Sequence, residues 1–114
     1  MATLAEQQIV YTGLAPAYVA AAAGGDTFAN DGSGRQFLHV KNADGVATRT
    51  VTVSAVVATT NKSGFNPLDV DDIVVVVPIS GERMIGPIEL TAYGSTPDIT
   101  YDDESDVTIG LFKA

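Results

Sequence analysis

The sequence predicts an all-β protein that folds as a single jelly-roll-like β-sandwich behind an N-terminal arm. About seven or eight short apolar segments are separated by turn signals rich in glycine, asparagine and aspartate. None of them shows the sustained 3.6-residue period of a long helix. The length of 114 residues suits one domain. The alternative is an immunoglobulin-like sandwich, which is weakened because the chain has no cysteine or tryptophan for the centre of that core.

Residues 1–16 differ from the rest and are expected to form the arm, with residues 17–114 as the sandwich domain. Thr12-Gly13 and Pro16 would interrupt a helix in the arm, and an isolated helix of about 10 residues is marginal in water. We expect a short helical turn or an extended path that becomes ordered against another molecule. A frayed terminus is the alternative.

The clearest strand signals lie on either side of Asp44-Gly45. In residues 35–42, Leu38 and Val40 alternate with polar and aromatic residues, which is typical of a strand covered on one side. Residues 48–57 continue the alternation. We therefore expect Asp44-Gly45 to form the tight turn of a β-hairpin that joins these two strands and sets the register of the sandwich.

Shorter strands complete the predicted sandwich. They are expected at residues 17–23, 72–78, 84–91, 98–102 and 106–112. Residues 58–68 are typical of a surface loop that crosses from one sheet to the other. The run Ile73–Val77 is continuously β-branched, so we expect burial on both faces, with a neighbouring subunit against the second face. Gly86-Pro87 indicates a bulge or kink, because proline cannot donate a hydrogen bond within a sheet.

The composition limits the partners that the protein can have. A net charge of -8 with only 6 basic residues argues against nucleic acid, because such binding depends on lysine and arginine at phosphates. The longest apolar run, residues 73–79, is too short to cross a membrane. The chain does not open with the pattern of a signal peptide, so we expect synthesis in the cytoplasm. Without cysteine it has neither a disulfide bond nor a thiolate nucleophile.

No catalytic pattern is visible in the sequence, and we expect neither an enzyme nor a cofactor. His39 is the only histidine, and it lies in mid-strand without a companion for a metal site or a serine triad. The carboxylates of residues 69–72 and 102–106 could offer oxygen ligands to calcium, but neither stretch has EF-hand spacing. Turn formation explains them as well, and a calcium-dependent structural domain is kept as an alternative.

Four stretches carry a resemblance to a known family: TLAEQQIVYTGLAPAYVAA, GGDTFANDGSGRQFLHVKNADG, VDDIVVVVPISGERMIGPIEL and ITYDDESDVTIGLFKA. With them, most of the chain resembles the small capsid decoration, or cement, proteins of tailed bacteriophages. The resemblance implies a virion protein, made in the host cytoplasm, that binds the capsid exterior and stabilises the shell. The implied partners are the major capsid protein and further copies of the chain in a homotrimer.

The resemblance points to broad surfaces and carries no catalytic, cofactor or metal residues. In the arm, the expected contacts with the capsid are Leu4, Ile9, Val10 and Tyr11. The expected interface between subunits is formed by Val74, Val75, Val76 and Val77. The alternative function is a tail or adhesion module that binds a host surface or glycan, although 7% aromatic residues without tryptophan would make a poor sugar platform.

Overall fold

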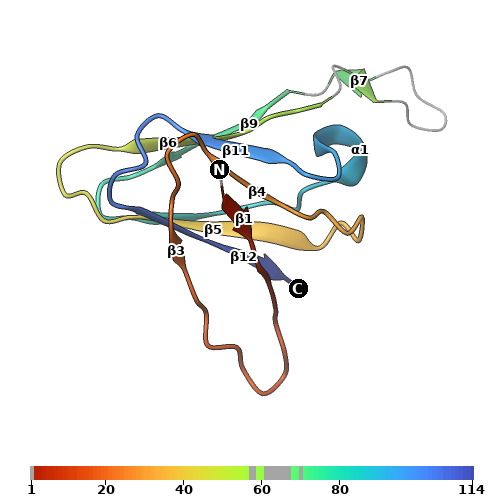
Figure 1. Ribbon diagram of the computed structural model, residues 1–114, viewed down its shortest axis with the longest axis horizontal. Helices are drawn as coiled ribbons and strands as arrows, with labels where there is room; N and C mark the ends of the chain where they lie inside the picture. The colour runs from red at the N-terminus through yellow and green to blue at the C-terminus, as the bar shows by residue number, and fades with distance from the viewer. Residues whose placement is uncertain (1, 57–58, 61–67, 70) are drawn as a thin grey trace.

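The computed structural model describes residues 2–56, 59–60, 68–69 and 71–114, and it confirms the all-β sandwich. Two five-stranded sheets face each other, and Figure 1 shows them as two layers. Sheet A has the order β1 (Ala2–Leu4), β4 (Asp26–Phe28), β11 (Asp98–Tyr101), β6 (Arg49–Val53) and β9 (Ile73–Val77). Sheet B has the order β10 (Glu82–Ile85), β5 (Gln36–Asn42), β12 (Val107–Lys113) and β2 (Glu6–Gln8), and β3 (Val19–Ala20) also pairs with β12.

Two minor elements lie outside these sheets. A short ribbon pairs β7 (Thr59–Thr60) with β8 (Leu68–Asp69) at the two ends of the predicted loop 58–68, whose other residues fall outside the described part of the chain. The strands on either side, β6 and β9, pair with each other in sheet A, so the predicted crossing to the other sheet is wrong. Within the described residues the single helix is α1 (Leu90–Tyr93). The jelly-roll connectivity stays a prediction.

The core lies between the two sheets and follows the predicted alternation. Leu38 and Val40 of β5 are fully buried, as are Val51 and Val53 of β6. Because successive side chains of a strand point to opposite faces, each strand sends one set inward and the other outward. The remaining large members of the core are Leu4, Phe28, Val77, Ile85, Ile88, Ile99, Val107, Ile109 and Leu111.

The predicted hairpin around Asp44-Gly45 is wrong, although both of its strands exist. β5 belongs to sheet B and β6 to sheet A, so the turn between them crosses from one layer to the other. Backbone N–H groups of Val46 and Ala47 donate to Asp44 Oδ1 at 2.8 and 3.3 Å, and this bends the chain at the crossing. The alternation of apolar residues shows which face of each strand is buried. It is equally compatible with a turn that closes a hairpin and with a turn that crosses to the other sheet. The partners of β5 are β10 and β12.

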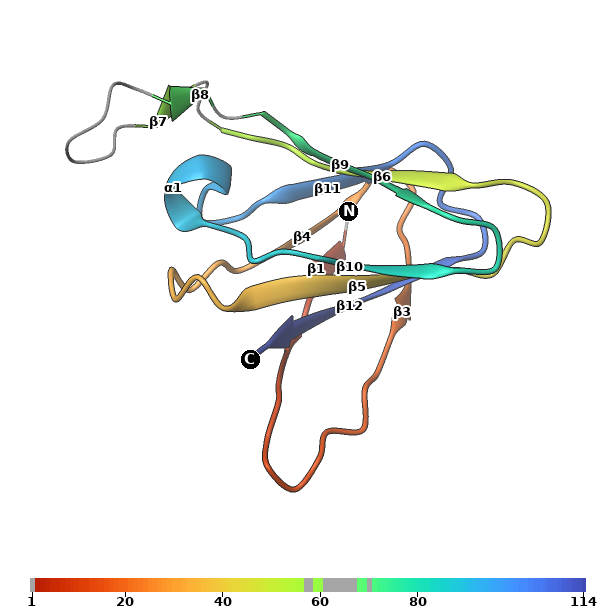
Figure 2. The same ribbon diagram turned by 180° about the vertical axis from the view of Figure 1, so that it is seen from behind.

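Residues 2–8 are part of the sandwich and not a free arm. β1 runs parallel to β4 in sheet A, and after Ala5 the chain enters sheet B, where β2 runs parallel to β12. Leu4 is only 6% exposed and packs in the core. The part that leaves the sandwich is the loop 9–18, which extends away from both layers before the chain returns as β3 (Figures 1 and 2).

Strand β9 closes one edge of sheet A, because no further strand pairs with it among the described residues. Its burial alternates: Val77 is fully buried, whereas Val74 and Val76 are 60% and 54% exposed. Within one chain the strand is therefore covered on one face only. The exposed face, with Val74 and Val76, is the one expected to meet a neighbouring subunit, and that contact stays a prediction. The β-branched composition reflects strand propensity as much as burial.

The predicted interruption at Gly86-Pro87 is confirmed, and it ends a shorter strand than expected. β10 stops at Ile85, the Gly86-Pro87 peptide bond is cis, and the segment then forms α1 in place of a longer strand. Gly86 has a φ of 150°, and a Cβ there would lie 2.7 Å from the Cβ of Phe37. A side chain at position 86 would therefore push β5 and this segment apart.

Candidate functional site

The outward face of sheet B carries a strip of aromatic and apolar side chains. In the register of the sheet, Met84 of β10 lies opposite His39 of β5, and Phe37 of β5 lies opposite Phe112 of β12. The rings of Phe37 and Phe112 stack with centroids 5.7 Å apart. Within the strip Met84 is 68% exposed, whereas Phe112 is 5% exposed. A contiguous apolar patch that stays exposed is typical of a contact surface.

Glycine at position 110 lets a further ring join the strip. A Cβ at Gly110 would lie 2.9 Å from the ring of Phe112 and 3.0 Å from the carbonyl oxygen of Ala17. Without it, the end of loop 9–18 lies close to β12, and the ring of Tyr18 packs 5.8 Å from that of Phe112 and 5.4 Å from the imidazole of His39.

Loop 9–18 and this strip enclose a hollow of about 400 Å³, here called the loop hollow. Its lining includes Ile9, Val10, Leu14, Tyr18, Phe37 and Met84. On the loop, Ile9 and Val10 are each 46% exposed and Tyr11 is fully exposed. The loop therefore presents three consecutive apolar or aromatic side chains to its surroundings.

Side chains at its base hold loop 9–18 in place. The side-chain Nε2 of Gln7 donates to the backbone carbonyl oxygen of Ala17 at 2.7 Å, and the backbone N–H of Ala17 donates to the side-chain Oε1 of Gln7 at 2.8 Å. These two bonds close the mouth of the loop as a strand pair would. The Lys41 ammonium lies 4.0 Å from the centre of the Tyr18 ring and covers it.

His39 has a structural role at this base. With Nε2–H directed at the Glu82 carboxylate 3.3 Å away, Nδ1 accepts a hydrogen bond from the Tyr18 hydroxyl at 2.7 Å. Both ring nitrogens are therefore engaged, and the residue is 9% exposed. The imidazole ties β5, β10 and the end of loop 9–18 together.

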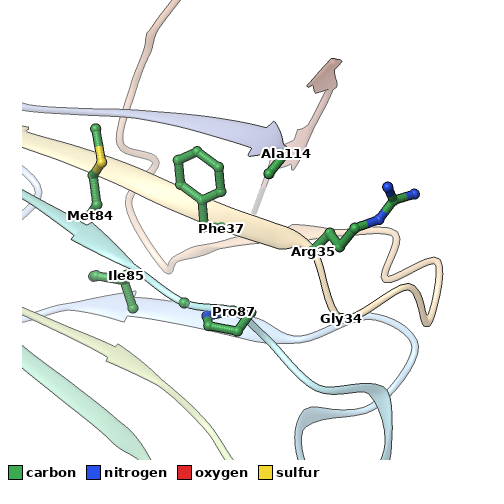
Figure 3. A pocket seen from close by; sticks show the side chains of 8 residues that line it. Gly34, Arg35, Phe37, Met84, Ile85, Pro87 and Ala114 are labelled. Atoms are coloured by element: carbon green, nitrogen blue, oxygen red, sulfur yellow. The ribbon is translucent and has the colours of Figure 1, made fainter. Parts of the chain in front are cut away.

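A second hollow, of about 440 Å³, lies at the end of β5 and β10 and is called the Arg35 hollow (Figure 3). It shares Phe37 and Met84 with the loop hollow, and its other main lining residues are Arg35, Ile85, Pro87 and Ala114. Its wall is apolar, with one guanidinium group at one end.

The acidic turns use their carboxylates to order the backbone. Asp102 Oδ1 accepts hydrogen bonds from the N–H groups of Thr50 and Asp103, each at 2.8 Å. Asp103 Oδ1 accepts one from the Ser105 N–H at 2.9 Å, and this bond is the main reason that the pKa of Asp103 is lowered. Among the described residues there is no group of three or more histidine, cysteine, aspartate or glutamate side chains that could hold a metal ion.

A fully buried carboxylate lies on the inner side of sheet A. Asp26 Oδ2 accepts a hydrogen bond from the Tyr101 hydroxyl at 2.6 Å and one from the Ala22 N–H at 3.2 Å. Burial and, after it, this bond to Asp26 raise the pKa of Tyr101 far above its usual value. The pair joins the ends of β4 and β11, and Oδ1 of Asp26 has no partner in the described part of the chain.

The structure divides the residues that were expected to make contacts. Ile9, Val10 and Tyr11 lie on the exposed loop, but Leu4 is buried in the core and is not available to a capsid, because β1 is paired within sheet A. On β9, Val74 and Val76 face outward, Val75 packs partly buried against the core, and Val77 is fully buried.

Sequence reasoning missed the residues behind the loop, which are Tyr18, Phe37, Met84 and Phe112. One signal was present, because the alternation of residues 35–42 and 106–112 had already placed Phe37 and Phe112 on the faces opposite the core residues. Their proximity depends on the pairing of β5 with β12, which the sequence does not show.

Within the described residues, no helix is long and apolar enough to span a membrane. Comparisons with protein-family models, with curated proteins and with solved structures found no match to this chain.

Proposed function

We propose that this protein is a capsid decoration protein of a tailed bacteriophage, which binds major capsid protein on the exterior of the shell, assembles as a homotrimer and stabilises the virion. One observation carries the proposal: loop 9–18 is fastened at its base yet exposes Ile9, Val10 and Tyr11. Exposing such side chains on an ordered projection has a cost in water, which contact with a partner removes.

The charge and the architecture support a protein partner. A net charge of -8 keeps separate copies soluble and makes direct binding to the packaged DNA unfavourable. A decoration protein needs no reaction chemistry, since it acts by binding the intact shell more tightly than the disrupted one. In a trimer, three loops would bind together, so contacts that are weak alone become strong through effective concentration.

The alternative of a glycan-binding adhesion module is less well supported. Sugar platforms need exposed aromatic faces, whereas Phe112 is only 5% exposed and the ammonium of Lys41 covers the ring of Tyr18. Tyr11 is fully exposed but stands alone at the loop, without a second ring beside it among the described residues.

The test is co-sedimentation with shells of the major capsid protein from the same phage, prepared without decoration protein. We expect the wild-type chain to pellet with the shells and to raise the temperature at which they disrupt. Val10→Ser and Tyr11→Ala should each weaken binding by about tenfold or more, as truncation of a buried interface anchor does. Val46→Ser is the matched control, because Val46 is 86% exposed on a different loop.

Each outcome bears on one part of the proposal. A wild-type chain that stays in the supernatant at concentrations well above those of the shell subunits would refute the decoration function. Binding that is unchanged in Val10→Ser and Tyr11→Ala would show that loop 9–18 is not the contact.

A further inference from the structure

The positive charges of this acidic protein are unevenly distributed. Of its 6 basic residues, Arg49 and Lys113 form ion pairs with aspartates and Lys62 lies outside the described residues. The other three all belong to strands of sheet B or flank them: Arg35, Lys41 and Arg83. In the described part of the chain, no carboxylate lies within ion-pairing distance of these three. Sheet B thus carries the uncompensated positive charge.

The Arg35 hollow combines that charge with an apolar wall. Figure 3 shows Phe37 and Met84 projecting on one side of their strands, Pro87 close by, and the guanidinium of Arg35 extending at one end. Met84 is 68% exposed, so apolar surface remains to be covered there. The chemistry that fits is an apolar side chain with a carboxylate a short distance away.

The chain itself carries such a surface in the other sheet. Val74 and Val76 of β9 are exposed, and exposed Asp71 and Asp72 directly precede this strand. Beside them, the Tyr93 hydroxyl donates to the carbonyl oxygen of Asp71 at 3.1 Å, and burial, followed by the charges of Glu89, Asp72 and Asp71, raises the pKa of Tyr93. The edge of sheet A therefore has an apolar stripe with a cluster of negative charge at one end.

We propose that the β9 edge of one copy docks on the Arg35 hollow of the next copy. This inference rests on the self-assembly in the proposed function, and it identifies the surface that receives the valines of β9. The two surfaces lie on different sheets of one chain, so the contact is heterologous, with copies joined head to tail. Copies with a net charge of -8 repel each other on average, and this orientation places the carboxylates against the unpaired cation.

The test measures the mass of the purified full chain by sedimentation equilibrium over a range of concentrations. Arg35→Glu and Asp71→Arg should each weaken self-association by about tenfold or more, because each places like charges together. Combining the two substitutions should restore association to nearly the wild-type level, since the charges are then exchanged. Asp98→Arg, at an exposed position of β11, is the matched control and should leave the mass unchanged.

Thermal melting of each variant shows that it is folded, and the same variants are carried through the shell co-sedimentation assay. A monomeric wild-type chain, or a double variant no better than the single ones, overturns the proposed contact. If the wild-type chain is monomeric but still binds shells, the decoration function stands without this contact. If the chain self-associates and the double variant restores association, but no variant binds shells, the contact stands and the decoration function is refuted. Loss of shell binding in Arg35→Glu with unchanged mass would show that the hollow receives a capsid segment, which also overturns the proposal.

Discussion

Substitution of Leu4 by alanine tests whether the N-terminal segment is part of the sandwich. Leu4 is 6% exposed in β1, and it packs in the core beside the paired strand β4. Shortening this side chain therefore removes buried apolar area and leaves a cavity. If residues 1–16 were a free arm, the same change would have no effect on folding.

The expected loss of unfolding free energy is about 2–3 kcal/mol. Buried Leu→Ala changes cost about 2–5 kcal/mol, and β1 lies at the edge of sheet A, where neighbouring side chains can relax into the space. Small domains have total stabilities of about 5–15 kcal/mol, so the change is a large fraction of the whole. The melting temperature should fall by roughly 8–12 °C in a chain of this size.

The assay is urea unfolding followed by circular dichroism, with thermal melting as a second measure. Val10→Ala is the control: Val10 is 46% exposed on loop 9–18, and surface changes of this kind are usually within about 0.5 kcal/mol of wild type. A Leu4→Ala variant that is as stable as the control would refute the docking of β1. Deleting residues 2–16 should likewise unfold the chain or strongly destabilise it, so that truncation is not a clean test of binding.

Two further predictions concern the dependence of stability on pH. The Tyr101 phenol is neutral in both states below about pH 10, and above that pH only the unfolded chain releases the phenol proton, because the pKa of Tyr101 is raised in the folded chain; the free energy of unfolding should therefore fall on the alkaline side. Tyr101→Phe should make this fall less steep in melting curves from pH 8 to 11. At neutral pH the same variant should cost about 1–3 kcal/mol, because Asp26 loses its hydrogen-bond donor. On the acid side, backbone hydrogen bonds from Val46 and Ala47 lower the pKa of Asp44, so its stabilising effect is present above about pH 4 and is lost as the pH falls through the lowered value. Asp44→Asn should reduce the acid-induced decrease in melting temperature between pH 5 and 2, and an unchanged decrease would refute a role of this turn.

The sequence predicted which face of a strand is buried far better than it predicted the partner of that strand. The alternation around Leu38 and Val40 is a local property, and it is found in the structure. Whether the turn at Asp44-Gly45 closes a hairpin or crosses between sheets depends on strands that lie far along the chain. β10 and β12 pair with β5, whereas β9 and β11 pair with β6. Short turn signals cannot separate these outcomes.

The candidate site was predictable only in part for the same reason. Ile9, Val10 and Tyr11 are consecutive apolar residues before a glycine, which indicates exposure on an irregular segment. Leu4 is the last residue of β1, and both β1 and β2 have only three residues, which is too short for a periodic pattern to show that Leu4 is buried while Ile9, Val10 and Tyr11 are exposed. The wall behind the loop combines Tyr18, Met84 and Phe112, and their meeting is fixed by long-range pairing alone.

The attachment of loop 9–18 determines how the molecule would respond to mechanical load. The chain enters the loop from β2 and leaves it into β3, and both strands pair with β12, near the middle of sheet B. One residue before β2, the chain is also fastened to sheet A through β1. A force on the loop tip is therefore divided between two short strands and passed to both layers. Detaching the loop would require the pairing of both β2 and β3 with β12 to break, so a partner pulled away from the loop would load β12 at the centre of sheet B.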